Sequence, residues 1–578
     1  MRTTVRRSPI TASSFAFLAL LLVALTACSA TPAELPAAES KPNTCAALAG
    51  NSIASTATGL PRGKAVVDAA QLLAATPATA TTPAIAEHCK ILGHIDPVDP
   101  AAEPIQFQLN LPVAWNHKAL QYGGGGYNGT LTTGMTPLRD AAPDDVLPLT
   151  RGYATLGTDS GHQLSRYAAN EIARFGLNDE MLANYAYASY KKVRDAAVVL
   201  MQRHYGQAPQ RVYYFGGSEG GREGLTMAQR FPADYDGIVS VVPVVQLSML
   251  FQSYLPHVRP QFAGGWMKPA KVEALARYVN RVCDGLDGLE DGVVNQWASC
   301  SLNAAQVDLQ RLRCDGGGDN GDACLSDAQL TAVRATREPY TLPFAVANGR
   351  RSYPPTLLGH ETTPDPRAPT MTRWVMGSAA PTPAVDAATA SQQWLYGANF
   401  VRFFVTRDAG YDVRNFDPAA HEARLREVSA LIDSSNPDLS AFFARGGKLI
   451  LRENMGDLAQ SPLAGIAYFE AVKARLGAAA VDASARLYIS PASTHTGHAT
   501  SVTTGDRVAT MADLLDPLDA WVSTGQAPPE AIVQTVKSPA PPHALQASRP
   551  MCRYPGYPHY MGGEPKQAAS YACRSALP

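Results

Sequence analysis

The 578-residue sequence carries little charge and no excess of either sign. Charged residues make up 17% of the chain, against about 25% in a typical soluble protein. Lysine and arginine number 49, aspartate and glutamate 50, and the formal net charge is −1. This balance excludes a strongly basic nucleic-acid-binding protein and a polyacidic tail, so we expect no nucleic-acid partner.

Three further patterns are missing. The sequence has no Cys-x-x-Cys pair, which argues against a structural zinc site. Neither Gly-Lys-Ser nor Gly-Lys-Thr occurs, which argues against a phosphate-binding loop. No internal repeat is detectable. What the sequence has instead is 46 glycines, 44 prolines and a length beyond the roughly 250–300 residues at which single cores stop growing, which together indicate a loop-rich globular protein.

The amino terminus has the layout of an export signal. Three arginines occur within the first seven residues, and an uncharged apolar run, Phe15 to Leu25, follows them. This run is too short for a permanent transmembrane helix. It leads into Leu25-Thr26-Ala27-Cys28, which resembles a bacterial lipoprotein signal that is cleaved before the cysteine.

We therefore expect a signal peptide over residues 1–27, a lipid on Cys28 and a tether over residues 28–44. Ser29 after the cysteine resembles signals that are sorted to the outer membrane. The expected location is an outer-membrane anchor facing the periplasm or the cell surface, with the lipid as the only contact with the membrane. The alternative is an ordinary signal and a secreted protein. The oligomeric state is left open.

Eight cysteines remain when Cys28 is set aside, an even number that is typical of disulfides in an exported protein. Many pairings of eight cysteines are possible, so the sequence alone does not select one. Pairing between sequence neighbours would give Cys45–Cys89, Cys283–Cys300, Cys314–Cys324 and Cys552–Cys573.

From about residue 105 onward, short apolar runs bounded by glycine alternate with helical patterns. The strand candidates are 106–111, 118–122, 153–158, 212–216, 238–243, 448–453 and 485–490. The helix candidates include 179–204, 222–231, 463–476 and 507–523. This alternation predicts an α/β fold around a mostly parallel sheet.

The alternation fails between about residues 246 and 440. That region is rich in proline, glycine and aspartate, and it contains four of the eight cysteines. It is too long for a connecting loop, so we predict an inserted lid domain at 246–440. The two parts of the core domain would then be residues 45–245 and 441–578.

A nucleophile motif follows the predicted strand at 212–216. The sequence Gly216-Gly217-Ser218-Glu219-Gly220 has the form Gly-x-Ser-x-Gly, and a helical pattern begins directly after it. A strand before the motif and a helix after it are the context of a nucleophile elbow. Such an elbow places the Ser218 hydroxyl at a helix N-terminus, where the helix dipole favours developing negative charge.

A second glycine-rich segment, Gly123 to Gly126, follows an earlier predicted strand. In hydrolases of this type a loop at this position supplies one amide of the oxyanion hole, and glycine permits a close approach of the backbone. Two amides are needed to bind the tetrahedral oxygen. We expect them to be those of Gly123 and Glu219.

The serine needs a base and an orienting carboxylate, which in this fold follow in the order serine, acid, histidine. Asp457 comes just past the predicted strand at 448–453, with Glu453 as the second candidate. His495 follows the predicted strand at 485–490, with His498 as its competitor. Placement at the ends of strands favours Asp457 and His495.

Together these motifs resemble the tannase and feruloyl esterase family, which includes a hydrolase of terephthalate monoesters. The resemblance covers about residues 45–575. The matching stretches are Gly123–Asn128, Thr158–His162, Gly216–Gly224, Arg230–Ile238, Cys283–Asn295, Met455–Asp457 and Arg549–Cys552. It implies an α/β-hydrolase fold with a large lid, a catalytic triad of Ser218, Asp457 and His495, and disulfides between sequence neighbours.

Two departures from the family pattern stand out. The family usually has a disulfide between a cysteine before the nucleophile and a cysteine after the histidine, but Gly217 and Thr496 stand there in this sequence. We therefore expect a triad that is held by packing alone and tolerates reductant. The predicted lid also lacks an arginine at the position where the terephthalate-monoester hydrolase of this family binds the free carboxylate of its substrate. We expect Trp394, Tyr396 and Phe400 to contact an aromatic ring.

A loop after Cys283 concentrates three carboxylates, those of Asp284, Asp287 and Asp291. Like charges in one turn repel unless a hard cation binds them, but spacing alone leaves a solvated turn equally open. The family resemblance implies a structural Ca²⁺ bound by these carboxylates and by the carbonyls of Leu289 and Val293.

The sequence thus predicts a secreted serine carboxylic-ester hydrolase that cleaves esters of hydroxycinnamic or gallic acids through an acyl-enzyme. One alternative is hydrolysis of terephthalate monoesters or related synthetic aromatic esters. Another is a non-catalytic lipoprotein that binds aromatic ligands.

Overall fold

The computed structural model describes residues 44–57, 59–303, 305–367 and 370–577. The predicted signal peptide, Cys28 and residues 28–43 of the predicted tether lie outside this part of the chain. The described residues belong to one compact unit. None of their helices combines the length and the apolar character needed to cross a bilayer.

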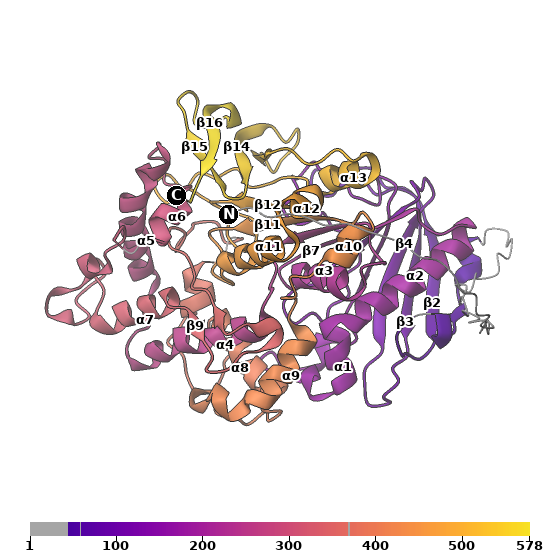
Figure 1. The fold of residues 1–578 in the computed structure, drawn as a ribbon, viewed down its shortest axis with the longest axis horizontal. Helices are drawn as coiled ribbons and strands as arrows, with labels where there is room; N and C mark the ends of the chain where they lie inside the picture. The colour runs from indigo at the N-terminus through magenta and orange to yellow at the C-terminus, as the bar shows by residue number, and fades with distance from the viewer. Residues whose placement is uncertain (1–43, 58, 304, 368–369, 578) are drawn as a thin grey trace, which may run out of the picture. The chain divides into compact units, whose positions relative to one another are not determined.

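A twelve-stranded mixed sheet organises the fold (Figure 1). Its six central strands are parallel to their neighbours within the group and almost completely buried, as their continuous apolar runs predict. In spatial order they are β6 (Ala154–Thr158), β5 (Lys118–Tyr122), β7 (Arg211–Gly217), β8 (Gly237–Val241), β11 (Lys448–Asn454) and β12 (Ala485–Ser490). All six coincide with predicted strands to within two residues at each end.

Both margins of the sheet are antiparallel. Beside β6 lie β4 (Ile105–Pro112), β3 (His88–Ile95), β2 (Ala65–Leu73) and β1 (Ser52–Ile53). Beside β12 lie β14 (Leu545–Arg553) and β13 (Ala531–Lys537). Of these, only β4 was predicted from the sequence.

Helices pack on both faces of the sheet. The longer ones on one face bury their apolar sides in a shared cluster with the strands, and they are α2 (Ser189–Tyr205), α3 (Glu219–Arg230) and α11 (Pro462–Leu476). On the other face, α13 (Leu515–Thr524) packs against side chains of β5, β7, β8 and β11. The predicted helix at 179–204 is present as α1 (Asp179–Ala183), a π-helical turn and α2, whereas the one predicted at 507–523 begins only at Leu515.

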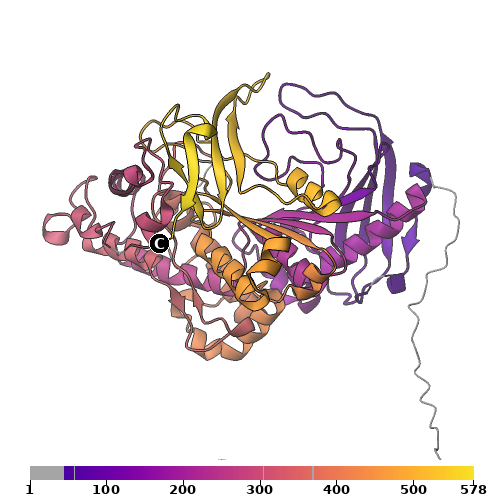
Figure 2. The same ribbon diagram turned by 45° about the horizontal axis from the view of Figure 1, so that its top comes forward.

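The chain between β8 and β11 adds no described strand to the large sheet. Its elements are α4 (Leu247–Val258), α5 (Pro269–Cys283), α6 (Trp297–Ser301), α7 (Asp327–Arg337), β9 (Tyr340–Thr341), β10 (Ser352–Tyr353), α8 (Gln392–Asn399), α9 (Glu422–Ile432), α10 (Ser440–Ala444) and several short 3₁₀ and π turns. They form two apolar clusters, one with α4, α8 and α9 and one with α5 and α7. Figures 1 and 2 show the pink helices α5 and α7 far from the indigo strands β2 and β3. The predicted lid lies in this segment, and its boundaries at 246 and 440 remain a prediction.

Four disulfides join the cysteines that are neighbours in the sequence: Cys45–Cys89, Cys283–Cys300, Cys314–Cys324 and Cys552–Cys573. Four bridges of this kind indicate an exported protein.

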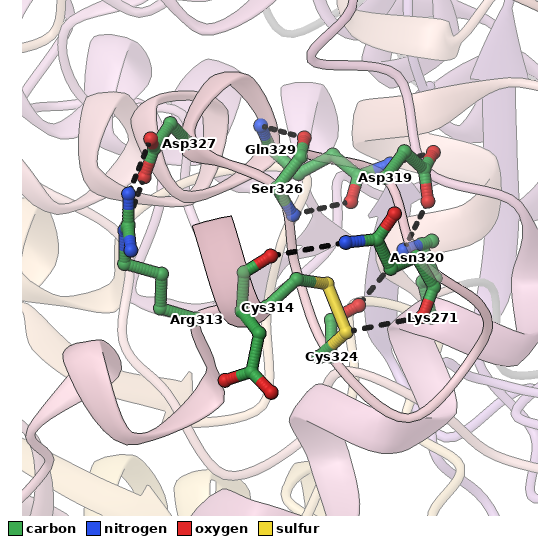
Figure 3. Close-up of a disulfide and its surroundings, with 10 residues drawn as sticks. Lys271, Arg313, Cys314, Asp319, Asn320, Cys324, Ser326, Asp327 and Gln329 are labelled. Atoms are coloured by element: carbon green, nitrogen blue, oxygen red, sulfur yellow. Dashed lines mark hydrogen bonds and ion pairs between the residues drawn. A yellow bond between two sulfur atoms is a disulfide. The ribbon is translucent and has the colours of Figure 1, made fainter. Parts of the chain in front are cut away.

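Figure 3 shows the surroundings of the Cys314–Cys324 bridge. The ammonium group of Lys271 donates to the Cys324 carbonyl at 2.8 Å and pairs with Asp319 at 2.6 Å. The bridge and this ion pair together hold the loop between Cys314 and Cys324 against α5.

Candidate active site

Ser218 occupies a sharp turn between β7 and α3. Its backbone has φ 60° and ψ −122°, a left-handed conformation that a non-glycine residue adopts only under strain. The turn leaves no room for a side chain at Gly216, where a Cβ atom would lie 2.3 Å from the Gly220 carbonyl oxygen. The strand, the turn and the helix therefore form the nucleophile elbow that the motif predicts.

The structure brings together the three predicted triad residues. His495 Nε2 lies 2.9 Å from Ser218 Oγ, and His495 Nδ1 lies 2.6 Å from Asp457 Oδ2. Asp457 is fully buried, and its second oxygen accepts the amides of Ala459 and Gln460 at 2.8 and 3.0 Å. This fixed carboxylate leaves the imidazole with Nδ1 as donor and Nε2 facing the serine, which is the arrangement that general-base catalysis requires.

The competing candidates lie outside this hydrogen-bond chain. Glu453 is buried in β11, where its carboxylate has no hydrogen-bond partner among the described residues, and burial raises its pKa well above the ordinary value. The carbonyl of His498 accepts from the Thr494 amide, but its ring makes no hydrogen bond to Ser218 or Asp457 within the described residues.

Hydrogen bonds from β11 brace the loop that carries His495. The Asn454 side-chain amide donates to the Thr494 carbonyl at 2.9 Å. Arg452, which is fully buried, donates to Ser493 Oγ at 3.2 Å and forms an ion pair with Asp140 at 3.1 Å. Hydrogen bonds as well as packing thus hold the loop, which differs from our expectation of packing alone.

Arg139 occupies the space beside Gly217. A Cβ atom on Gly217 would lie 2.2 Å from Arg139 Cδ, and the Arg139 guanidinium donates to the His495 carbonyl. Thr496 instead donates its hydroxyl to the Arg367 carbonyl. A cysteine side chain at position 217 would therefore require Arg139 to move.

The structure contradicts the prediction for Gly123. Its amide donates to the Phe215 carbonyl at 2.9 Å and so continues the pairing of β5 with β7, which leaves it unavailable to a substrate. Glu219 is the first residue of α3, and its amide has no partner within the helix. Gly125 and Gly126 line the cavity beside Ser218. The Gly125 amide donates to Asn128 Oδ1 at 2.7 Å, which leaves the Gly126 amide as the candidate in this turn for the second position of an oxyanion hole.

Glu223 on α3 fixes this glycine-rich turn. One carboxylate oxygen accepts the Gly124 amide at 2.9 Å and the Tyr214 hydroxyl at 2.7 Å. The other accepts the Asn128 side-chain amide at 2.8 Å and the Tyr190 hydroxyl. A fully buried carboxylate with four donors holds the turn in one position relative to Ser218.

A cavity of about 240 Å³ opens on Ser218 and His495. Its aromatic lining comes from Phe251 and Tyr254 of α4, from Trp374 and from Tyr396 of α8. The ring of Trp374 meets the His495 ring edge to face, with centroids 5.4 Å apart. Aromatic side chains of the segment between β8 and β11 therefore cover the nucleophile.

Of the three predicted substrate contacts, only Tyr396 lines this cavity. Trp394 packs on Phe262 and donates its indole N–H to the Thr382 carbonyl at 3.3 Å. Phe400 is buried against Phe251 and other aromatic rings. The predictions for Trp394 and Phe400 are wrong because the helix and turn that carry them direct these side chains into an apolar core.

The structure adds cavity residues that the sequence analysis missed, namely Arg139, Phe251, Tyr254, Trp374 and Gln460. Phe251 and Tyr254 are three residues apart and so share one face of a helix, a spacing visible in the sequence. The other three lie in loops and turns without a recognisable motif.

The predicted calcium loop is compact, and its carboxylates already have partners. Asp284 accepts the amides of Gly292 and Val293 at 2.8 and 3.1 Å, and Asp291 pairs with Arg549 at 2.6 Å. Burial raises the pKa of Asp287 to about 7. Within the described residues, no group of three or more His, Cys, Asp or Glu side chains is arranged to hold a metal ion.

Two features of the loop still fit the cation. Asp291 Oδ1 is buried without a hydrogen-bond partner, and the donors are all oxygen atoms, the kind that Ca²⁺ prefers. The calcium site stays a prediction.

The fold and the arrangement around Ser218 define an α/β-hydrolase. The chain belongs to the tannase and feruloyl esterase family, whose sequence model matches residues 89–574. It is accordingly a carboxylic ester hydrolase.

The relatives agree with this assignment. The chain is 36% identical over 551 residues to an uncharacterized esterase of Agrobacterium fabrum, covering 92% of each chain. It is 30% identical over 557 residues to the mono(2-hydroxyethyl) terephthalate hydrolase of Piscinibacter sakaiensis, covering 89% of each. The crystal structure of feruloyl esterase B from Aspergillus oryzae superposes with a TM-score of 0.68 at 22% identity, covering 88% of this chain and 97% of that one.

Proposed function

We propose that the protein is an exported serine esterase that cleaves esters of aromatic acids, such as hydroxycinnamic or gallic acid, through an acyl-enzyme. The observation that carries the proposal is the hydrogen-bond chain from Asp457 through His495 to Ser218, at 2.6 and 2.9 Å, which ends in a cavity with aromatic walls. The membership of the tannase and feruloyl esterase family supports the same class of substrate.

In the acylation step, Ser218 Oγ attacks the ester carbonyl and gives its proton to His495 Nε2. Asp457 accepts the hydrogen bond from His495 Nδ1–H and stabilises the imidazolium that forms without taking its proton. The amides of Glu219 and Gly126 bind the oxyanion, and the position of Glu219 at the N-terminus of α3 adds the favourable end of a helix dipole. His495 then returns the proton to the departing alcohol oxygen.

In the deacylation step, water replaces the alcohol. His495 Nε2 accepts a proton from the water as its oxygen attacks the acyl carbon. Collapse of the tetrahedral intermediate breaks the bond to Ser218 Oγ, which takes the proton back from His495. The products are the free acid and the unchanged enzyme.

Substitution of the nucleophile tests this function. Wild-type protein and Ser218→Ala would be assayed with methyl ferulate, methyl gallate and mono(2-hydroxyethyl) terephthalate. We expect turnover of the first two by the wild type and a loss of at least about 10³-fold in kcat for Ser218→Ala. Binding without turnover in both proteins would refute the esterase function, and turnover of the terephthalate monoester alone would refute the substrate class.

We propose two further features. A structural Ca²⁺ bound by Asp284, Asp287 and Asp291, with the carbonyls of Leu289 and Val293, would compensate the carboxylates of that loop. A lipid on Cys28 would anchor the protein in the outer membrane, and Cys28→Ala would then move the protein from the membrane fraction to the soluble fraction. Equal fractionation of the two proteins would contradict the anchor.

A further inference from the structure

Gln460 presents an unusual polar group at the active-site cavity. It lies in the turn between β11 and α11, three residues after Asp457, and it is among the residues that line the cavity. Its side chain is 1% exposed. Neither the amide oxygen nor the amide nitrogen has a hydrogen-bond partner among the described residues.

A buried amide without partners is costly, and native proteins rarely leave one unless a ligand or a water molecule completes its hydrogen bonds. The Gln460 backbone is not free to adjust, because its N–H donates to Asp457 Oδ1 at 3.0 Å. The amide is therefore held at the cavity wall by the same turn that fixes the triad carboxylate.

Other polar groups at the cavity are only partly engaged. The Tyr254 hydroxyl donates to the Ala459 carbonyl, and the Arg139 guanidinium donates to the His495 carbonyl. Glu219 binds Arg222 through one carboxylate oxygen, at 2.8 Å from Nε, while its other oxygen is buried without a partner. Within the described part of the chain, the buried unpaired groups of the cavity residues are thus the Gln460 amide, one Glu219 oxygen, Arg139 Nε and the Trp374 indole nitrogen.

This set of groups discriminates between substituents on a bound ring. A hydroxyl group both donates and accepts, so it can satisfy either end of the Gln460 amide. A carboxylate only accepts, so it would leave the Gln460 amide oxygen unpaired even where Arg139 or Trp374 donates to it. A ring without a substituent satisfies neither end. The cavity volume, about 240 Å³, is below the roughly 300–1,000 Å³ of sites for drug-sized ligands and suits an acyl group with one ring.

We propose that Gln460 determines the acyl specificity of this enzyme by hydrogen-bonding a hydroxyl substituent on the aromatic ring of the bound acid. The inference rests on the proposed function and assigns its preferred substrates to the esters of phenolic acids.

The first experiment compares three esters: methyl 4-hydroxycinnamate, methyl cinnamate and mono(2-hydroxyethyl) terephthalate. We expect wild-type kcat/KM to favour the hydroxylated ester over methyl cinnamate by roughly ten- to a hundredfold, the effect of leaving a buried polar group unpaired. In Gln460→Met, a variant of similar size without the amide, this ratio falls to near one. The proposal would be overturned if the wild type showed no preference for the hydroxylated ester, or if Gln460→Met kept the wild-type preference. A wild-type kcat/KM that is higher for the terephthalate monoester than for methyl 4-hydroxycinnamate would overturn it as well.

Gln393→Met is the matched control. Gln393 is also a fully buried glutamine, but its amide is paired, with His257 Nδ1 and the Leu458 carbonyl each at 3.1 Å, and it does not line the cavity. We expect this variant to lose stability and to keep the wild-type preference between the two cinnamates. Thermal unfolding of both variants separates a loss of selectivity from a loss of fold.

A second measurement separates this proposal from the serine mechanism. Calorimetry would compare the binding of 4-hydroxycinnamate and cinnamate to Ser218→Ala and to Ser218→Ala/Gln460→Met. If Ser218→Ala binds 4-hydroxycinnamate more tightly than cinnamate and the double variant does not, the role of Gln460 is supported. This result does not depend on which residue is the nucleophile. Equal binding of both acids to Ser218→Ala refutes it, whereas turnover by Ser218→Ala refutes only the proposed mechanism.

Discussion

Glu223 is the residue on which the position of the glycine-rich turn depends most directly. It accepts four hydrogen bonds, two of them from Gly124 and Asn128 at the two ends of the turn that lines the cavity. It does not line the cavity itself, so its role is to position the amides that would bind the oxyanion.

Glu223→Gln places an amide NH₂ where one carboxylate oxygen accepts two donors. Two hydrogen bonds are lost and donor groups are forced together, so the turn shifts away from Ser218. We expect kcat to fall by about ten- to a hundredfold with a smaller change in KM, because the turn acts in the transition state. Steady-state kinetics with one aromatic ester measures this, and Glu427→Gln on the exposed face of α9 serves as the control. An equal rise in KM at constant kcat would contradict a role in the oxyanion hole.

At this scale the sequence predicts the residues whose placement follows from a strict local motif. Ser218 is fixed by the glycines of its turn, and Asp457 and His495 follow the ends of adjacent parallel strands. The prediction of Gly123 as an oxyanion-hole residue is wrong because its amide extends the strand pairing by one residue beyond the predicted strand end. Gln460 and Arg139 were missed because no pattern distinguishes a cavity side chain in a turn from a solvent-exposed one.

At the scale of elements, the loop after β12 takes its position from β11 and from residues 139 and 140. Arg452 of β11 contacts both Ser493 Oγ in this loop and the buried carboxylate of Asp140. The loop that carries His495 is thereby attached to a strand of the central sheet.

Asp140→Asn would leave the Arg452 charge buried without its partner. Breaking a buried ion pair by removing one member typically costs about 3–5 kcal/mol, so we expect a loss of this size in the free energy of unfolding. Asp144→Asn is the control four residues away, because its ion pair with Lys537 is partly exposed and is worth at most about 1 kcal/mol. Urea denaturation of both variants gives the comparison, and equal losses would contradict the buried pair.

The strands predicted from the sequence are those of the central parallel group and β4, because a strand buried on both faces is a continuous apolar run. The other strands at the margins were missed for a physical reason. β2 is buried at Ala65 and Val67 but mostly exposed or half-buried from Asp68 onward, and β13 alternates buried with exposed positions, so neither gives a strong apolar signal. The helix predicted over 507–523 begins later than predicted, because Arg507 and Met511 form isolated β-bridges with other segments before α13 begins.

At the scale of the whole molecule, the cavity combines segments that are far apart in the sequence. The nucleophile elbow, the α4 helix, Trp374, Tyr396 and the turn after β11 all contribute to its wall. The tertiary fold alone brings them together, so no reading of local sequence predicts the full lining.

Removal of calcium tests the proposed metal at this scale. The cation binds only the folded loop, so its removal lowers the stability of the folded state. We expect a chelator to lower Tm by at least about 2 °C and the addition of Ca²⁺ to restore it. Asp287→Asn should show little response to either treatment. An unchanged wild-type Tm, with no calcium found by elemental analysis, would contradict the site.

Acid should destabilise the protein through buried histidines. Burial lowers the pKa of His257 to about 4, whereas in the unfolded chain the value is near 6.5. Between pH 6.5 and 4 the unfolded state therefore binds a proton that the folded state does not, and the free energy of unfolding falls as the pH falls. His257→Asn should reduce this dependence by up to about 1.4 kcal/mol per pH unit, measured by urea denaturation at pH 7 and pH 5. Parallel profiles for the two proteins would contradict it.

The central claim is that Ser218 carries the acyl group during turnover. Its most direct test is mass spectrometry of protein quenched in acid during hydrolysis of an activated aromatic ester such as 4-nitrophenyl ferulate, whose good leaving group makes deacylation the slower step. We predict a feruloyl group on the peptide that contains Ser218, absent in Ser218→Ala and present in a control substituted at the neighbouring Ser240. An unmodified Ser218 peptide throughout steady-state turnover, or turnover retained in Ser218→Ala, would contradict the account.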